Sequence, residues 1–100
     1  MYNSLKLTLY TQEDCGYCKL LKKKLSEWNF DYREINISHD LFAKDFLKEN
    51  GHRTVPQLYH GRTHLNKFPT EELTKQNILD ELDYENYIGG VENWGALKSA

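Results

Sequence analysis

The chain has 100 residues, 39% of them apolar and 13% aromatic, with a formal net charge of −2. This length suits one small domain with a modest core, and the slight acidic excess argues against general nucleic-acid binding, because few phosphates could be neutralised. No apolar run approaches the roughly 20 residues of a membrane-spanning helix, and the first ten residues lack the features of a signal peptide, so we expect a single cytoplasmic domain, residues 1–100, that is monomeric and binds neither nucleic acid nor membrane.

A strand followed by a helix is predicted at the start of the chain. Residues 5–11 (LKLTLYT) alternate apolar and polar side chains, which is typical of a strand with one buried face. Helical spacing then takes over, and one apolar stripe is formed by Cys18, Leu21, Leu25 and Trp28. The Cys-x-x-Cys pair, which contains the only two cysteines of the chain, therefore lies where the strand passes into the helix.

Two further strands and a second helix follow. Residues 30–37 have high β propensity and predict a strand. Residues 38–51 begin with cap-type side chains and end at an Asn-Gly pair, which predicts a helix. Residues 54–60 predict a short strand that begins near a proline. This β-α-β-α-β order indicates an α/β layered fold whose first two strands are parallel.

The last part of the chain is more acidic. Residues 61–100 carry 4 Lys or Arg against 7 Asp or Glu. A helix is predicted over residues 70–83, with Thr70 as its N-cap. Residues 87–100 (YIGGVENWGALKSA) predict a short strand, a Gly-Gly turn and a final helix.

The predicted turn places the two cysteines in different environments. Cys15 lies at the first helical turn, where unpaired N–H groups and the helix dipole stabilise a thiolate. Cys18 lies one turn deeper, on the apolar stripe, and is expected to be buried. An exposed thiolate that attacks a disulfide, with a buried partner that resolves the intermediate, is the arrangement of a dithiol catalyst.

Metal binding is the alternative. Cys15, Cys18, His60 and His64 supply four ligand types that suit tetrahedral zinc. However, the 41 residues between the cysteine pair and the histidine pair contain two full secondary-structure elements, whereas compact zinc fingers use a much shorter loop. The context therefore favours a redox dithiol.

Three motifs together resemble the glutaredoxin family, a branch of the thioredoxin-fold proteins: Cys15-Gly-Tyr-Cys18, Thr54-Val55-Pro56 and Tyr87-Ile-Gly-Gly90 followed by Glu92-Asn93. The resemblance implies a thioredoxin-like three-layer α/β/α sandwich with a four-stranded mixed sheet. It also implies a glutathione-dependent thiol-disulfide oxidoreductase in which Cys15 is the nucleophile and Cys18 the resolving thiol. The Val55–Pro56 bond is then expected to be cis, as X–Pro bonds can be at modest cost.

A glutathione groove is also implied by the resemblance. The backbone of Val55 would pair with the cysteinyl part of glutathione, and the glycine pair would bind the γ-glutamyl end at a helix N-terminus. The groove residues would be Gln12, Tyr17, Arg53, Thr54, Val55, Pro56, Gly89, Gly90, Glu92 and Asn93. Glutathione would be the co-substrate, and disulfide-containing proteins such as ribonucleotide reductase or glutathionylated proteins would be the targets. Either glutathione or a thioredoxin-type reductase could reduce the Cys15–Cys18 disulfide back to the dithiol.

Two site residues depart from the family pattern. Gly16 stands where the family usually has proline, and relatives with a small residue there can hold a glutathione-ligated [2Fe-2S] cluster between two monomers. A cluster carrier is therefore a second alternative function. Gln12 stands where the family commonly has Lys or Arg to bind the glycyl carboxylate of glutathione, and Arg53 or Lys19 could supply the missing charge.

The spacing of the last motif also departs from the family. Residues 61–85 are interpreted as an acidic insertion between the last two strands, with the final strand near Gly89-Gly90. In the alternative alignment, residues 59–65 (YHGRTHL) form the final hairpin and the glycine pair has no such role. We favour the glycine pair, because it leads directly into an apolar-spaced helix start.

Overall fold

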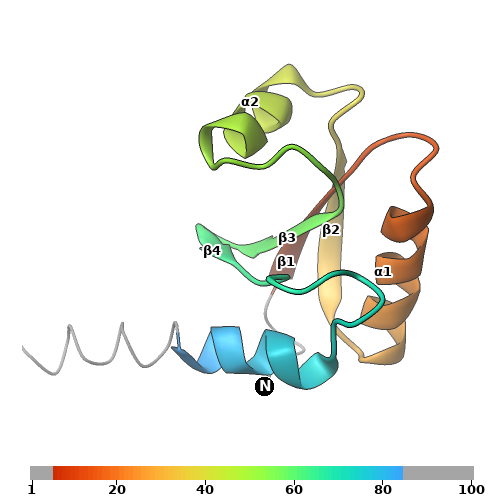
Figure 1. Ribbon diagram of the computed structural model, residues 1–100, viewed down its shortest axis with the longest axis vertical. Coiled ribbons are helices and arrows are strands. Elements are labelled where there is room, and N and C mark those ends of the chain that lie inside the picture. The colour runs from red at the N-terminus through yellow and green to blue at the C-terminus, as the bar shows by residue number, and fades with distance from the viewer. Residues whose placement is uncertain (1–5, 85–100) are drawn as a thin grey trace, which may run out of the picture.

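The computed structural model describes residues 6–84 (Figure 1). Its elements follow the predicted order, and their bounds are β1 Lys6–Thr11, α1 Gly16–Glu27, β2 Asp31–Asn36, α2 Leu41–Glu49, β3 Gln57–His60 and β4 Thr63–His64. Residues 75–84 are also helical. None of the helices in this part of the chain is both long and apolar enough to cross a membrane.

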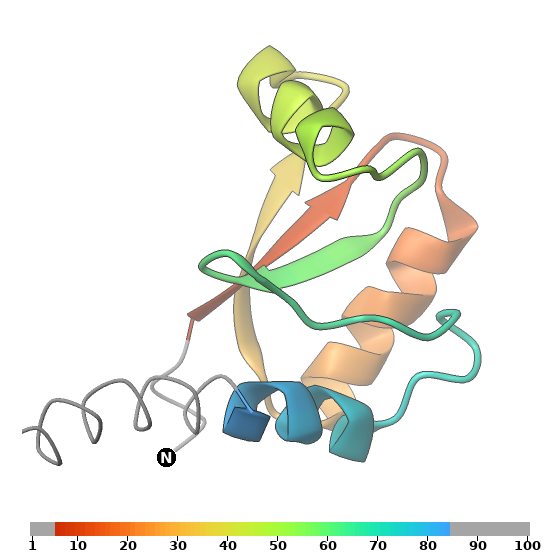
Figure 2. The same ribbon diagram turned by 60° about the vertical axis from the view of Figure 1, so that its left-hand side comes forward.

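The strands form one mixed sheet in the order β2-β1-β3-β4. β1 and β2 are parallel, as predicted, whereas β3 is antiparallel to both β1 and β4. The helix α1 and the helix of residues 75–84 lie on one side of this sheet, and α2 lies beyond its other side (Figures 1 and 2). The predicted four-stranded mixed sheet is therefore confirmed.

The main core lies between the sheet and the two helices on its α1 side. Because side chains alternate across a strand, leucines of β1 and β3 reach this side and pack against apolar residues of both helices. The cluster consists of Leu7, Leu9, Leu21, Leu25, Phe30, Leu58, Leu65, Leu73, Ile78 and Leu82. Each fully buried leucine stabilises the fold by about 1.5–3 kcal/mol, which fixes α1 and the cysteine turn at its start against the sheet.

An aromatic cluster covers the α2 side of the sheet. Tyr10 of β1 stacks on Phe46 of α2 at 5.4 Å between ring centroids. Tyr59 of β3 meets Phe46 edge to face at 5.2 Å. The rings of His52 and His64 pack beside it, with their centroids 4.6 Å apart. This cluster holds α2 and the segment that leaves it against the sheet.

The predicted start of the last described helix is wrong. Thr74, not Thr70, caps this helix: its Oγ1 accepts a hydrogen bond from the Asn77 N–H at 3.1 Å, and Asn77 Oδ1 accepts one from the Thr74 N–H at 2.9 Å. Thr70 is instead buried in the preceding turn, where its carbonyl accepts a hydrogen bond from Lys24 Nζ at 2.6 Å. This contact comes from α1, so no local pattern around Thr70 signals it.

The fourth strand also differs from the favoured alignment. It is formed by Thr63 and His64, which pair with β3. The hairpin of residues 59–65 therefore closes the described sheet, and residues 61–84 contain β4 and the helix of residues 75–84. Gly89 and Gly90 lie outside the described residues.

Candidate active site

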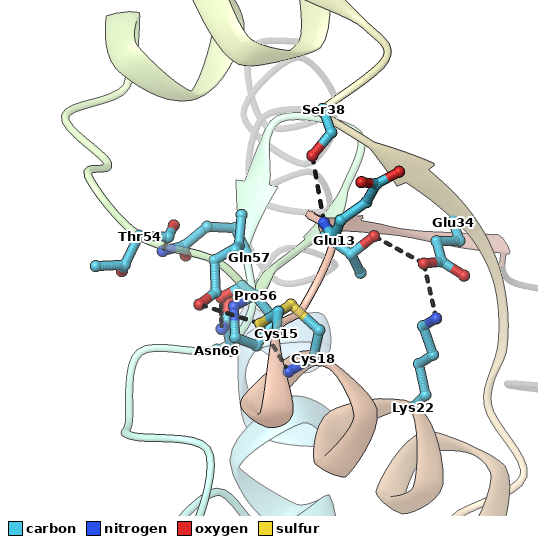
Figure 3. Close-up of a disulfide and its surroundings, with 12 residues drawn as sticks. Glu13, Cys15, Cys18, Lys22, Glu34, Ser38, Thr54, Pro56, Gln57 and Asn66 are labelled. Atoms are coloured by element: carbon cyan, nitrogen blue, oxygen red, sulfur yellow. Dashed lines mark hydrogen bonds and ion pairs between the residues drawn. A yellow bond between two sulfur atoms is a disulfide. The ribbon is translucent and has the colours of Figure 1, made fainter.

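Cys15 is the N-cap of α1. Its Sγ accepts a hydrogen bond from the Cys18 N–H at 3.1 Å, and it is disulfide-bonded to Cys18, with the two Cα atoms 5.2 Å apart (Figure 3). Cys15 is half-buried, whereas Cys18 is only 2% exposed and packs on the buried side of the helix. The expected difference in exposure between the two sulfurs is present. In the reduced state the same N–H and the helix N-terminus would stabilise a Cys15 thiolate.

Asp14 and Gly16 flank Cys15 in the turn that leads into α1. Asp14 has φ 55°, a left-handed conformation that aspartate tolerates better than most residues. At Gly16, a Cβ added to the backbone would meet nothing within 4 Å. The space around this position therefore does not require glycine.

The loop of residues 54–56 faces the disulfide. The Val55–Pro56 peptide bond is cis, which confirms the prediction. Cys15 Sγ lies 4.0 Å from the carbonyl oxygen of Val55. Pro56, the last residue of the loop, is buried. The cysteine turn and the loop, 40 residues apart in the sequence, thus form the two sides of one site (Figure 3).

Two side-chain amides hold this loop. Gln57 Nε2 donates to the Thr54 carbonyl at 3.0 Å, and Gln57 Oε1 accepts from His64 Nε2 at 2.8 Å. Asn66 Nδ2 donates to the Pro56 carbonyl at 3.0 Å. The sequence predicts no role for Gln57 or Asn66 and indicates His64 only as a candidate zinc ligand. The contacts of His64 and Asn66 depend on the hairpin of residues 59–65, which is not the favoured alignment.

A basic cleft lies between α2 and the loop. It has a volume of about 470 Å³ and is lined by Gln12, Ile37, Lys44, Leu47, Lys48, His52, Arg53, Thr54 and Val55. Lys44 and Lys48 are four residues apart and so share one face of α2. With Arg53 they give this cleft three cationic side chains, and no carboxylate is among its lining residues. The cleft therefore suits an anionic group.

A second cleft, of about 430 Å³, lies on the other side of Val55. Its walls include Tyr17, Pro56 and Glu71. Tyr17 is 54% exposed, and its hydroxyl donates to Glu71 Oε2 at 3.0 Å. This hydrogen bond raises the pKa of Tyr17, because the nearby carboxylate disfavours the phenolate. Since Val55 and its neighbour Thr54 line both clefts, a ligand that pairs with the loop backbone can extend into each of them.

Most of the predicted groove residues come together around the disulfide. Those in the described part of the chain each line one or both clefts, namely Gln12, Tyr17, Arg53, Thr54, Val55 and Pro56. The remaining predicted residues, Gly89, Gly90, Glu92 and Asn93, lie outside the described residues.

The zinc alternative fails on geometry. Tyr59 pairs with His64 across the β3–β4 hairpin, and His60 pairs with Thr63. Cross-strand partners share a face and successive residues alternate, so His60 and His64 lie on opposite faces of the sheet. Between residues 6 and 84, no three His, Cys, Asp or Glu side chains gather as a metal site. The four residues considered as zinc ligands therefore do not converge: Cys15, Cys18, His60 and His64.

A hydrogen-bonded pair also ties α1 to β2 beside the site (Figure 3). Glu34 Oε2 lies 2.7 Å from Lys22 Nζ, and it accepts a hydrogen bond from Thr11 Oγ1 at 2.7 Å. The bonds from Lys22 and then Thr11 lower the pKa of Glu34, because both favour its charged form. The pair lies at the end of β1 and helps to fix the strand that leads into the cysteine turn.

Comparison with known proteins agrees with this geometry. The Glutaredoxin family model matches residues 7–65, which end directly after β4. A putative glutaredoxin of Mycobacterium tuberculosis is 42% identical over 52 residues, covering 50% of this chain and 62% of the relative. Glutaredoxin 1 of Rickettsia conorii is 32% identical over 80 residues, covering 76% of this chain and 78% of the relative.

A second group of relatives is glutaredoxin-like. The NrdH protein of Escherichia coli is 30% identical over 57 residues, covering 57% of this chain and 70% of the relative. The solved structure of E. coli NrdH-redoxin superposes with a TM-score of 0.57 at 28% identity, covering 60% of this chain and 79% of that one. The fold, the redox dithiol and the family match over more than half of the sequence lead to one conclusion: the chain belongs to the glutaredoxin family.

Proposed function

We propose that this protein is a thiol-disulfide oxidoreductase that reduces glutathione mixed disulfides and protein disulfides, with Cys15 as the nucleophile and Cys18 as the resolving thiol. The observation that carries the proposal is the placement of Cys15. It is a half-buried helix N-cap that faces the Val55 carbonyl, and its disulfide partner is 2% exposed. A substrate sulfur can therefore approach Cys15, while Cys18 can be reached only through Cys15.

The reaction proceeds by two exchanges. The Cys15 thiolate attacks the glutathione sulfur of a mixed disulfide, a new sulfur–sulfur bond forms, and the target protein leaves as a thiolate that takes up a proton from water. Cys18, deprotonated, then attacks Cys15 Sγ and releases glutathione, which yields the Cys15–Cys18 disulfide present in the structure. Two molecules of glutathione reduce this disulfide and leave as glutathione disulfide.

Glutathione fits the site in one orientation. Its cysteinyl backbone pairs with Val55 beside Cys15, and its glycyl carboxylate occupies the basic cleft near Lys44, Lys48 and Arg53. These three cations supply the charge that Gln12 lacks. The γ-glutamyl end then points toward the second cleft. Binding of that end by the predicted residues of 89–93 stays a prediction.

A thioredoxin-type reductase is the second candidate reductant. The residue that commonly binds the glycyl carboxylate in this family is the uncharged Gln12 here, and the E. coli NrdH-redoxin to which the chain is similar has a thioredoxin-like activity profile. With this reductant the exchange reactions at Cys15 are the same, and only the reduction of the Cys15–Cys18 disulfide differs. Disulfide-containing proteins, ribonucleotide reductase among them, are the proposed targets in both versions, and the protein is proposed to act as a cytoplasmic monomer.

One coupled assay separates these outcomes. The purified chain is incubated with a glutathione mixed disulfide and NADPH, once with glutathione and glutathione reductase, and once with thioredoxin reductase alone. NADPH oxidation in the first mixture supports glutathione as the reductant, and oxidation only in the second supports the thioredoxin-type route. Absence of turnover in both mixtures would overturn the proposed function. An absorbance spectrum recorded under anaerobic conditions tests the [2Fe-2S] alternative in the same preparation.

A further inference from the structure

Val55 is held from both sides by side chains. The carbonyl before it, that of Thr54, accepts a hydrogen bond from Gln57 Nε2 at 3.0 Å. The carbonyl after it, that of Pro56, accepts one from Asn66 Nδ2 at 3.0 Å. The Thr54–Val55 and Pro56–Gln57 peptide units are therefore held on either side of the Val55–Pro56 bond. The carbonyl oxygen of Val55, which lies between them, is 4.0 Å from Cys15 Sγ.

Asn66 extends the β3–β4 pairing beyond the end of β4. The Leu65 N–H donates to the Leu58 carbonyl at 2.8 Å, and the next N–H of the ladder, that of Leu58, donates to Asn66 Oδ1 at 2.8 Å. The side-chain amide of Asn66 then donates to Pro56. It thus replaces a backbone peptide group and carries the hydrogen-bonding pattern of the sheet into the loop.

Gln57 is oriented by His64. Because an amide side chain has one accepting and one donating end, the bond from His64 Nε2 to Gln57 Oε1 turns Gln57 Nε2 toward the Thr54 carbonyl. Gln57 is 8% exposed, so its rotation to another partner is restricted. His64 is in turn held by ring packing against His52 at 4.6 Å and against Tyr59 at 5.2 Å.

We propose that Asn66 and Gln57 are positioning residues for disulfide exchange, which act by holding the Val55 backbone where a substrate chain pairs with it beside Cys15. This inference rests on the proposed function, because it assumes a substrate with a peptide backbone next to its disulfide. A backbone that is already held in place when the substrate arrives lowers the cost of binding, so loss of either amide should weaken substrate binding more than the exchange step at Cys15. Thiol chemistry that needs no pairing with Val55 does not depend on either amide.

The test uses isosteric variants of the full chain. Asn66→Asp keeps the acceptor for the Leu58 N–H but removes the donor to Pro56, and Gln57→Glu keeps the acceptor for His64 but removes the donor to Thr54. Asn77→Asp is the matched control, because it makes the same chemical change at an acceptor in the helix cap of Thr74. For each protein, kcat and KM are measured with a glutathione mixed-disulfide peptide, together with the rate at which iodoacetamide alkylates Cys15 and the thermal midpoint.

We expect KM to rise about tenfold in Asn66→Asp and in Gln57→Glu, as for loss of one hydrogen bond at a buried or half-buried carbonyl. The alkylation rate and kcat should stay within about twofold of the wild type, and Asn77→Asp should match the wild type in all of these parameters. Equal losses in KM, kcat and alkylation rate would assign a merely structural role to the amides. If the wild type is active and both variants keep its KM, the positioning role of Asn66 and Gln57 is overturned, whereas the proposed function is not.

Inactivity of the wild type would instead overturn the proposed function. If Asn66→Asp does not fold, Asn66→Ser, which is too short to bridge both partners, takes its place and is judged by the same criteria. Gln57→Glu tests the opposite side of the loop independently.

Discussion

The sulfur of Cys15 lies 4.0 Å from the carbonyl oxygen of Val55, although the two residues belong to segments with no shared strand or helix. The cysteine turn is fixed by the packing of α1 on the sheet, and the loop is held by side-chain amides from β3 and from the end of the hairpin. Rigid elements therefore bring Cys15, the proposed nucleophile, and the Val55 backbone, the proposed partner of the substrate chain, together.

Replacing Cys15 and replacing Cys18 should affect the reduction of disulfide substrates differently. Cys15→Ser removes the nucleophile, so all disulfide reduction should be lost. Cys18→Ala should retain reduction of a glutathione mixed disulfide, because a second glutathione can resolve the intermediate, but should reduce the rate with a protein disulfide by roughly tenfold or more. Parallel assays with a glutathionylated peptide and with insulin measure this difference. The reverse pattern would exchange the roles of the two thiols.

Replacing Gly16 by proline should stabilise the fold. Gly16 is the first residue of α1, where proline is favoured because its missing N–H has no helical acceptor. A Cβ added there meets no atom within 4 Å. Proline also restricts the unfolded chain, so we expect a gain of about 0.4–1 kcal/mol in the free energy of unfolding.

Urea denaturation of oxidised wild type and Gly16→Pro measures this gain. Gly61→Pro is the contrasting control, because φ is +60° at that position and proline cannot adopt it. A loss of stability in Gly16→Pro would show that the turn needs the freedom of glycine.

Neutralising the basic cleft should weaken the use of glutathione specifically. The double variant Lys44→Gln/Lys48→Gln removes two cations from the cleft lining, and we expect KM for a glutathione mixed disulfide to rise by about threefold to tenfold, since each exposed charge contributes up to ~1 kcal/mol. The double variant Lys23→Gln/Lys75→Gln makes the same charge change at exposed positions that do not line the cleft.

Added salt should narrow the difference between the cleft variant and the wild type, because ions screen exposed charges. Equal KM values for the cleft and control variants would place the glycyl carboxylate elsewhere.

Sequence patterns were sufficient for the part of the fold in which each element has its own periodicity. The apolar stripe of α1, the alternation of β1 and the proline motif at Val55–Pro56 predicted the elements, the parallel pairing and the cis bond. β4 has two residues, too few to show any alternation, so no sequence pattern favoured it. The strand predicted near Gly89-Gly90 lies outside the described residues.

The same short strand explains what was missed in the site. Asn66 reaches Pro56 where Leu65 pairs with Leu58, so this contact can be recognised only once the hairpin of residues 59–65 is known. Lys44 and Lys48 were missed for another reason. They lie on the solvent-facing part of an amphipathic helix, and only the folded loop shows that this face forms one wall of a cleft.

The histidine pair on the α2 side should make stability depend on pH. Burial lowers the pKa of His52, and burial together with the nearby His52 lowers the pKa of His64. The hydrogen bond with Asn66 opposes this shift, Lys67 lowers the pKa of His64 further, and Glu81 also opposes the shift. When a folded-state pKa is depressed below the ordinary value of about 6.5, the unfolded chain binds protons first as the pH falls.

The free energy of unfolding should therefore be highest above about pH 6.5 and should decrease as the pH falls below it, until the folded-state histidines are also protonated. Urea denaturation at about pH 7.5 and about pH 5 measures this decrease. His64→Gln, which can still donate to Gln57 Oε1, should show a smaller decrease than the wild type. His39→Gln makes the same substitution at an exposed histidine and serves as the matched control. Equal decreases in His64→Gln and the wild type would mean that His64 does not contribute to the pH dependence.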